Sequence, residues 1–155
     1  MWDTLFSLTN LLALAGWIVL AFLPHKPLPL TAVLYLGVGL LCLCYAVLAG
    51  LLLGGAVDSS PVPGAAGFEL AGMSIDNIRA LFMTDGGIVV GWTHYLAFDL
   101  FVGLWIAKDA DAKGFSRLVQ FPFLLLTFLA GPIGLLLWLF ARERRARIGA
   151  RARAR

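Results

Sequence analysis

Three side chains that can donate or accept a proton lie close together in one apolar stretch of the chain. His94, Tyr95 and Asp99 all fall within residues 91–101, where most other residues are apolar. Imidazole, phenol and carboxyl groups are the usual participants in general acid–base chemistry. An ionisable side chain at bilayer depth costs about 2.5–3.5 kcal/mol on insertion scales, and such a residue is by default a candidate functional group. Asp99, far from both ends of its apolar segment, is therefore the first candidate.

Helical periodicity divides these residues between two faces. Tyr95 and Asp99 are four residues apart and share one face, with Trp92 a further turn back. His94 precedes Asp99 by five residues, so it is displaced by about 140° and cannot easily bond Asp99 within the helix. The face of His94 also carries three aromatic residues, which are Phe98, Phe101 and Trp105. The two faces either address different neighbouring helices or flank one cavity from its edges.

A purely structural role for Asp99 is the competing interpretation. Its carboxyl could join helices through a hydrogen bond to Tyr95, or to polar residues of other apolar segments, which are Thr9, Asn10 and Thr127. Such bonds contribute only about 0.6 kcal/mol on average in membrane proteins, which compensates poorly for a buried charge. The aromatic residues nearby are open to a similar interpretation as lipid-facing or core side chains.

The elements that position these residues are predicted from composition and hydropathy. The chain has 155 residues, of which 61% are hydrophobic and 14% charged, outside the usual range of soluble domains. A helix needs about 20 apolar residues to cross a bilayer, and four windows satisfy this, at 5–23, 30–53, 86–107 and 118–141. Long continuous apolar runs do not suit barrel strands. We therefore expect an all-α, four-span transmembrane helical bundle forming a single membrane domain over residues 1–155.

The connections between these windows differ in character. Residues 24–29 are rich in proline and predict a tight turn. Residues 54–85 form a long connection that starts with glycine and proline and then shows apolar residues at three- and four-residue spacing over 74–83. This pattern predicts a short amphipathic helix between spans two and three, at the membrane interface or folded back on the bundle. Residues 108–114 are interpreted as a plain polar turn.

The sequence Gly131-Pro132-Ile133-Gly134 falls in the middle of the last span. Pro132 lacks the N–H that would bond the carbonyl four residues earlier, so a kink is expected there. A kink lined with small residues either packs against a neighbouring helix or opens a pocket. Pro132 is therefore included among the candidate substrate-binding residues.

The distribution of positive charge predicts the orientation of the chain in the membrane, although two ways of counting these charges disagree. If four spans place both termini on one side, that side carries eight positive side chains against four, largely from the Arg-rich tail at 142–155. The short connections alone favour the opposite orientation, because they carry four positive side chains on one side and one on the other. Because the tail adjoins the last span, we expect the C-terminus in the cytoplasm of a bacterium and the chain in its inner membrane. The tail is interpreted as an anionic-lipid anchor, and no nucleic-acid partner is expected.

The candidate residues and the sequences around them resemble those of a known family. Trp92, His94 and the sequence Asp99-Leu100-Phe101, with Ile78–Phe82 before them and Pro132-Ile133-Gly134 after them, resemble the abscisic-acid-deficient-4-like membrane proteins. That family includes neoxanthin-synthase-related proteins of plastids and bacterial relatives. The resemblance covers about residues 70–140, while spans one and two match only in hydropathy.

The resemblance implies a chemistry. The plastid members are implicated in turning violaxanthin into neoxanthin, in which an epoxide opens and an adjacent double bond becomes an allene. This isomerisation needs an acid for the epoxide oxygen and a base for a carbon-bound proton, and it requires no redox cofactor. By position, His94 and Asp99 would be the catalytic pair, and the shared helix face adds Tyr95. The walls of the site would be aromatic: Trp92, Phe98, Phe101 and Trp105.

Two functions from different classes follow. The first is an integral membrane protein that binds, and as an isomerase converts, a carotenoid or related isoprenoid lipid, without a metal or other cofactor. The second is a non-catalytic pigment- or lipid-binding or assembly subunit, in which the polar groups join helices. An ion pathway through Asp99 is less favoured, because a relay normally needs several partners. Association into a homo-oligomer is left open.

Overall fold

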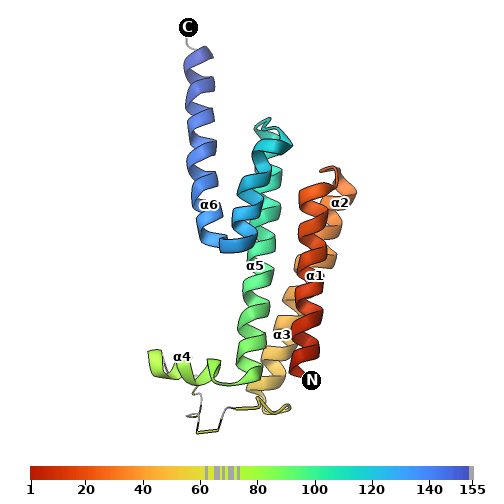
Figure 1. Cartoon of the computed structure of the whole chain (residues 1–155), viewed down its shortest axis with the longest axis vertical. Coiled ribbons are helices and arrows are strands. Elements are labelled where there is room, and N and C mark those ends of the chain that lie inside the picture. Colours follow the sequence, from red (N-terminus) through yellow and green to blue (C-terminus); the bar gives the residue numbers. More distant parts are fainter. Residues whose placement is uncertain (62, 65–66, 68, 70–71, 73, 154–155) are drawn as a thin grey trace.

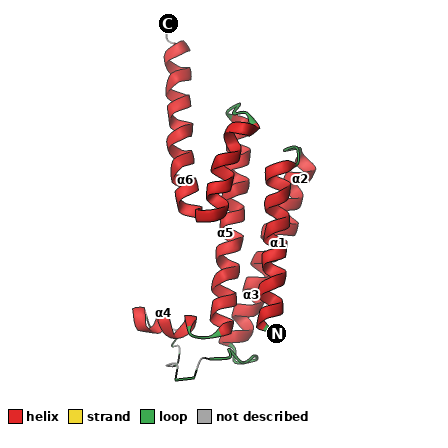
Figure 2. Ribbon diagram, in the orientation of Figure 1, coloured by secondary structure: helices red, strands yellow, loops and turns green. Residues whose placement is uncertain are grey.

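The computed structural model describes residues 1–61, 63–64, 67, 69, 72 and 74–153, and these form helices without a strand (Figures 1 and 2). The helices are α1 (Trp2–Phe22), α2 (Pro27–Ala32), the π-helical segment η1 (Val33–Gly39), α3 (Leu40–Leu53), α4 (Ile75–Phe82), α5 (Asp85–Ala112) and α6 (Arg117–Arg153). Four helical stretches are long and apolar enough to cross a membrane: Trp2–Phe22, Pro27–Leu53, Asp85–Ala112 and Arg117–Glu143. The predicted all-helical fold with four such segments is confirmed. A helix also occupies 75–82, and its place at a membrane interface stays a prediction.

Helix α5 is the centre of the bundle, with α1, α3 and α6 packed around it. Close approach depends on glycine, because a residue without a side chain lets neighbouring helices come together. A methyl group on Gly103 would lie 2.4 Å from the ring of Trp17, and one on Gly16 would lie 2.7 Å from the side chain of Leu100. Leu100 is fully buried at the crossing of α1, η1 and α5.

Helix α5 is longer than its apolar window. It begins after Thr84, whose hydroxyl accepts a hydrogen bond from the backbone N–H of Gly87 at 2.9 Å, and it continues to Ala112. Its 28 residues span about 42 Å at 1.5 Å per residue. The expected polar turn over 108–114 is therefore wrong, because residues 108–112 belong to the helix and Gly114, at φ 67°, makes the turn.

Helix α6 reverses direction in its middle. Ala130 has φ −154° and ψ 62°, which breaks the helix two residues before Pro132. The ring of Trp138 lies 5.3 Å from that of Phe123, whereas a straight helix would separate these residues by about 22 Å. The two halves of α6 therefore lie side by side as a re-entrant hairpin (Figure 1), and the break at Ala130 puts Ala130 and Gly131 at its tip. The predicted kink is present and is sharp enough to turn the chain back.

The hairpin sets the positions of the two termini. Trp2 packs near Gly86 at the start of α5, whereas Arg142 bonds to Asp109 near the end of α5. The N-terminus and the C-terminal half of α6 therefore lie at opposite ends of the bundle (Figure 1). The expectation that both termini share one side is wrong, since α6 enters the bundle and returns to the end from which it came.

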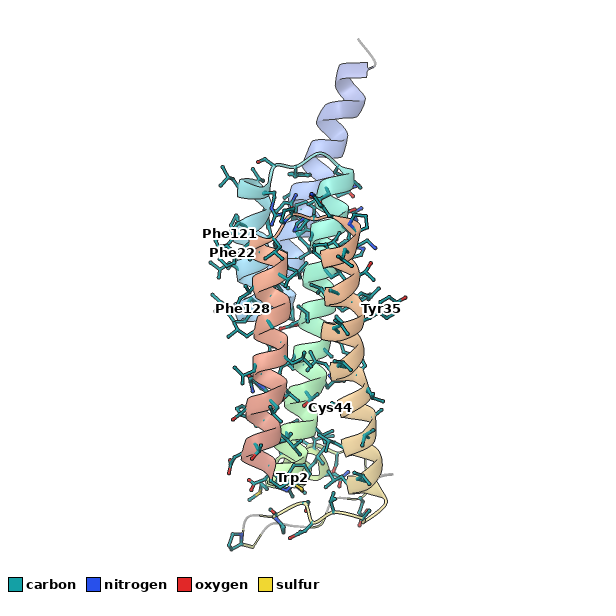
Figure 3. The ribbon with its side chains drawn as sticks, turned by 90° about the vertical axis from the view of Figure 1, so that its right-hand side faces the viewer. Trp2, Phe22, Tyr35, Cys44, Phe121 and Phe128 are labelled. Atoms are coloured by element: carbon teal, nitrogen blue, oxygen red, sulfur yellow. The ribbon has the colours of Figure 1, made fainter. Side chains whose placement is uncertain are left out.

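The first half of the hairpin packs beside α1. Figure 3 shows Phe22, Phe121 and Phe128 together on one side of the bundle, with Tyr35 pointing outward on the other. The rings of Trp17 and Phe128 meet edge to face, with centroids 5.6 Å apart. These contacts hold the first half of α6, before the break at Ala130, against α1. The tip of the hairpin reaches α5 at the level of Asp99.

Candidate functional site

Asp99 lies on α5 directly beside the hairpin tip. Its side chain is buried, with the residue 9% exposed. A methyl group added to Gly131 would lie 2.1 Å from Oδ1 of Asp99 and 2.8 Å from Oδ2. The carboxyl therefore rests on the backbone of Gly131, and a residue with a side chain could not take that position without movement.

Tyr95 stands one turn before Asp99 and completes a small polar group. Its hydroxyl lies close enough to the Asp99 carboxyl and to the backbone of Gly131 to interact with both. Oδ2 of Asp99 is buried and has no hydrogen-bond partner among the residues that the structure describes. An unsatisfied buried polar atom costs about 1–3 kcal/mol. The group of Asp99, Tyr95 and Gly131, which we call the tip site, can therefore accept one further donor or bind a proton.

The second half of α6 adds an electrostatic feature to the tip site. A helix has unpaired N–H groups in its first turn and a partial positive charge at its N-terminus. The half-helix that starts after the break at Ala130 presents this end at Gly131, against the Asp99 carboxyl. A negative charge on Asp99 is favoured at that place. This contact is also a structural reason for a carboxyl at this depth.

Below the tip, toward the N-terminal end of the bundle, α6 leaves one face of α5 uncovered (Figure 1). The ring of Trp92 lies 5.1 Å from that of Tyr95 and 5.8 Å from that of Phe6, and its Nε1 donates to Asn10 at 3.1 Å. Phe82 of α4 lies against Gly91 on the same stretch of α5. We call Phe6, Phe82 and Trp92 the lower aromatic face. All three are 37–48% exposed, so aromatic surface is accessible next to Tyr95.

His94 is not brought to Asp99. Its ring lies 4.6 Å from that of Phe98 and 5.5 Å from that of Tyr45 on α3. The helix periodicity left two arrangements open, and the one observed directs Asp99 toward α6 and His94 toward α3. Sequence reasoning grouped Tyr95 with Asp99 correctly.

The predicted wall residues are likewise divided. Trp92 and Pro132 lie near the tip site, on the lower aromatic face and in the hairpin tip. Phe98 and Phe101 instead line a groove of 440 Å³ between α5 and the consecutive helical segments η1 and α3. Trp105 lies farther along α5, with the guanidinium of Arg142 5.3 Å from its ring centroid.

Sequence reasoning missed a polar cluster at the C-terminal end of the bundle. Asp109 accepts hydrogen bonds from Nε1 of Trp138 at 3.1 Å and from Arg142 at 3.1 Å. Asp111 pairs with Nδ1 of His25 at 2.7 Å and accepts a bond from Gln120 at 2.7 Å. These contacts tie the α1–α2 turn and both halves of α6 to α5. The two aspartates at 109 and 111 were visible in the sequence, but Trp138 and Arg142 meet Asp109 only because α6 doubles back.

No curated protein and no solved structure was found to match the chain. The sequence model of the family described as ABA DEFICIENT 4-like matches residues 4–138, which includes nearly all of α1, all of α2 to α5, the tip site and most of the hairpin. The chain therefore belongs to the ABA DEFICIENT 4-like family.

Proposed function

We propose that this chain binds a carotenoid or a related isoprenoid lipid at the tip site and isomerises it by acid–base chemistry. The observation that carries the proposal is the unpartnered Oδ2 of the buried Asp99, beside the hydroxyl of Tyr95. Family membership supports the class of ligand, since the chain belongs with the ABA DEFICIENT 4-like proteins. The hairpin tip at Gly131 closes this polar group from above.

The side chains of Asp99 and Tyr95 can supply the two proton transfers that an epoxide isomerisation needs. One group donates a proton to the epoxide oxygen as a carbon–oxygen bond breaks, and the other accepts a proton from a neighbouring carbon as a new double bond forms. One proton is gained and one is lost, so the product is an isomer and no oxidant or reductant is consumed. The Tyr95 hydroxyl and the Asp99 carboxyl are neighbours that interact, so a proton can pass between them after each turnover.

The ligand reaches this pair through the membrane interior. The lower aromatic face offers exposed rings beside Tyr95, and such rings favour contact with a polyene or isoprenoid chain. The polar end group would enter beneath Gly131 while the apolar chain lies along Trp92 toward α4. His94 faces α3 with Tyr45 and Phe98, so we assign the proton transfers to Asp99 and Tyr95 and not to His94.

The test uses protein purified gently from membranes that contain an epoxy-carotenoid, followed by absorbance and mass spectrometry of the bound pigment. Asp99→Asn keeps the shape of the side chain and should abolish conversion, and Tyr95→Phe should lower conversion at least tenfold. Asp3→Asn, which changes an exposed carboxyl at the N-terminal end of the bundle, is the matched control and should convert normally. A folded Asp99→Asn protein that converts the pigment at the rate of the control would refute the proposal.

One observation favours the alternative of a non-catalytic binding or assembly subunit. The Asp99 carboxyl lies at the N-terminus of the second half-helix of α6, where a negative charge stabilises the helix end. If that is its whole role, Asp99→Asn lowers the thermal stability and leaves the spectrum of any bound pigment unchanged. Loss of conversion in a protein of unchanged stability separates the two functions.

We further propose that the C-terminal end of the bundle faces the cytoplasm, in a bacterial inner membrane. Five cationic side chains lie at that end, which are Lys26, Lys108, Lys113, Arg117 and Arg142, and α6 carries further arginines beyond them. Among the described residues, Arg79 on α4 is the cation at the opposite end. With the hairpin, the tail and the short connections share one side, so both charge counts support the same orientation.

A further inference from the structure

A groove runs along the outside of α5, on the face that is remote from the tip site. Its middle part, of 440 Å³, is lined by residues of η1, α3 and α5, among them Val38, Cys42 and Phe98. A second hollow, of 340 Å³, continues toward the C-terminal end of the bundle beside Trp105 and Lys108. Leu34 and Phe101 line both hollows, so the two form one continuous groove.

The α5 wall of the groove is a single stripe of side chains. Phe98, Phe101, Trp105 and Lys108 recur at three- and four-residue spacing and therefore share one face of the helix. The distance from Phe98 to Lys108 along the helix is about 15 Å, which is half of the hydrocarbon thickness of about 30 Å. The groove therefore extends from the middle of the bundle to its cationic end.

The opposite wall is the π-helical segment η1, which supplies Leu34 and Tyr35. π-Helical turns are rare in proteins, and those that do occur often lie at functional sites. Gly39, the last residue of η1, also borders the groove.

The chemical character of the groove changes at Lys108. The walls up to Trp105 are apolar and aromatic, whereas Lys108 is exposed and takes part in no ion pair among the described residues. Asp109 also lines this hollow, but its carboxylate already pairs with Lys113 at 3.6 Å and with Arg142 at 3.0 Å. The ammonium group of Lys108 is therefore available to a ligand at the end of an apolar groove.

We propose that this groove binds an acidic lipid, with an acyl or isoprenoid chain against Phe98 and Phe101 and the negatively charged head group on Lys108. Each hollow lies within the range of about 300–1,000 Å³ typical of small-molecule sites. The positive charge at the rim selects a lipid of net negative charge over a zwitterionic one with the same chains. The site is separate from Asp99 and does not depend on the proposed isomerisation.

The head-group contact is tested by native mass spectrometry of the full-length protein in micelles that contain equal amounts of phosphatidylglycerol and phosphatidylcholine with identical chains. The wild-type protein should retain phosphatidylglycerol preferentially. Lys108→Gln should reduce that preference about fivefold, the factor that corresponds to about 1 kcal/mol per basic residue near the surface. Lys108→Arg should restore the preference. Lys113→Gln, at the same end but already paired with Asp109, is the control and should retain it.

The chain contact is tested by filling the groove. Cys42→Trp places a large ring in the hollow beside Phe98 and should reduce retention of both lipids at least fivefold. Leu43→Trp places the same ring on α3 at an exposed residue that does not border the groove, and should leave retention unchanged.

The outcomes separate this proposal from the proposed function. Equal retention of phosphatidylglycerol by wild-type protein and Lys108→Gln, or unchanged retention by Cys42→Trp, would overturn the acidic-lipid site. Asp99→Asn should retain phosphatidylglycerol as the wild type does, because the tip site is on another face of α5. Failure of the isomerisation test therefore leaves this result unaffected.

Discussion

Replacing Gly131 with alanine tests the contact on which the tip site depends. The added methyl group would lie 2.1 Å from Oδ1 of Asp99, 2.7 Å from its carboxyl carbon and 2.8 Å from Oδ2. Real contacts of a Cβ atom essentially never fall below 3.0 Å, so either the carboxyl or the hairpin tip must move. Asp99 has a short side chain that also interacts with Tyr95, so the carboxyl has little room to move away.

The expected cost follows from this geometry. Overpacking a well-packed interior destabilises by about 1–3 kcal/mol, and 1 kcal/mol corresponds to about 2–4 °C in Tm for chains of this size. Gly131→Ala should therefore lower the Tm by at least about 2 °C. Gly50→Ala is the matched control, because a methyl group at Gly50 in α3 meets nothing within 4 Å. Alanine is favoured over glycine inside a helix by about 0.5–1 kcal/mol, so this control should leave the Tm unchanged or raise it.

The assay is thermal unfolding in detergent, followed by tryptophan fluorescence, for the two single variants and for a double-mutant cycle. Asp99→Ala removes the carboxyl that the new methyl group would meet, so Gly131→Ala should cost much less in that background. We expect a coupling free energy of at least about 1 kcal/mol, within the range found for residues in contact. Additive effects of the two substitutions, or a stability of Gly131→Ala equal to that of Gly50→Ala, would refute the direct contact between the carboxyl and the hairpin tip.

Three further predictions concern the hairpin and the helix ends. In a cysteine-free variant, single cysteines at Ser116 and Glu143 should react with an impermeant maleimide from the same side of the membrane. A straight helix between these residues would be about 40 Å long and would place them on opposite sides. Asp109→Ala should lower the free energy of unfolding by about 1–3 kcal/mol, measured by steric trapping, because it removes the charged partner of Arg142. Thr84→Ala should cost about 1 kcal/mol through loss of the N-cap of α5, and Thr84→Ser, which keeps the hydroxyl, should cost less than half as much in the same assay.

The division of the chain into helices was predictable from the sequence, for a local reason. A bilayer core of about 30 Å demands about 20 apolar residues for each crossing, and hydropathy along the chain reports this directly. The grouping of Tyr95 with Asp99 was also predictable, because residues four apart on an α-helix always share a face. The separation of His94 from Asp99 follows from the same 100° step, although the sequence alone could not say which neighbouring helix each residue would meet.

The reversal of α6 was only partly predictable. The sequence predicted a weak point in the helix at Gly131, Pro132 and Gly134, because proline removes a backbone hydrogen bond and glycine adds backbone conformational freedom. A kink of some tens of degrees and a full hairpin are both compatible with these residues. The choice depends on contacts between residues far apart in the chain, such as the ring of Trp138 against those of Phe115 and Phe123.

The sequence by itself determined an integral membrane protein with a carboxyl and a phenol on one face of its third apolar helix. The tertiary structure decided where that face points, because only packing of the α6 hairpin brings Gly131 onto Asp99. It also decided that Asp109 meets Trp138 and Arg142 at the C-terminal end. The physical reason is that helix periodicity and hydropathy act within a few turns, whereas the partner of a buried side chain depends on how distant segments fill space together.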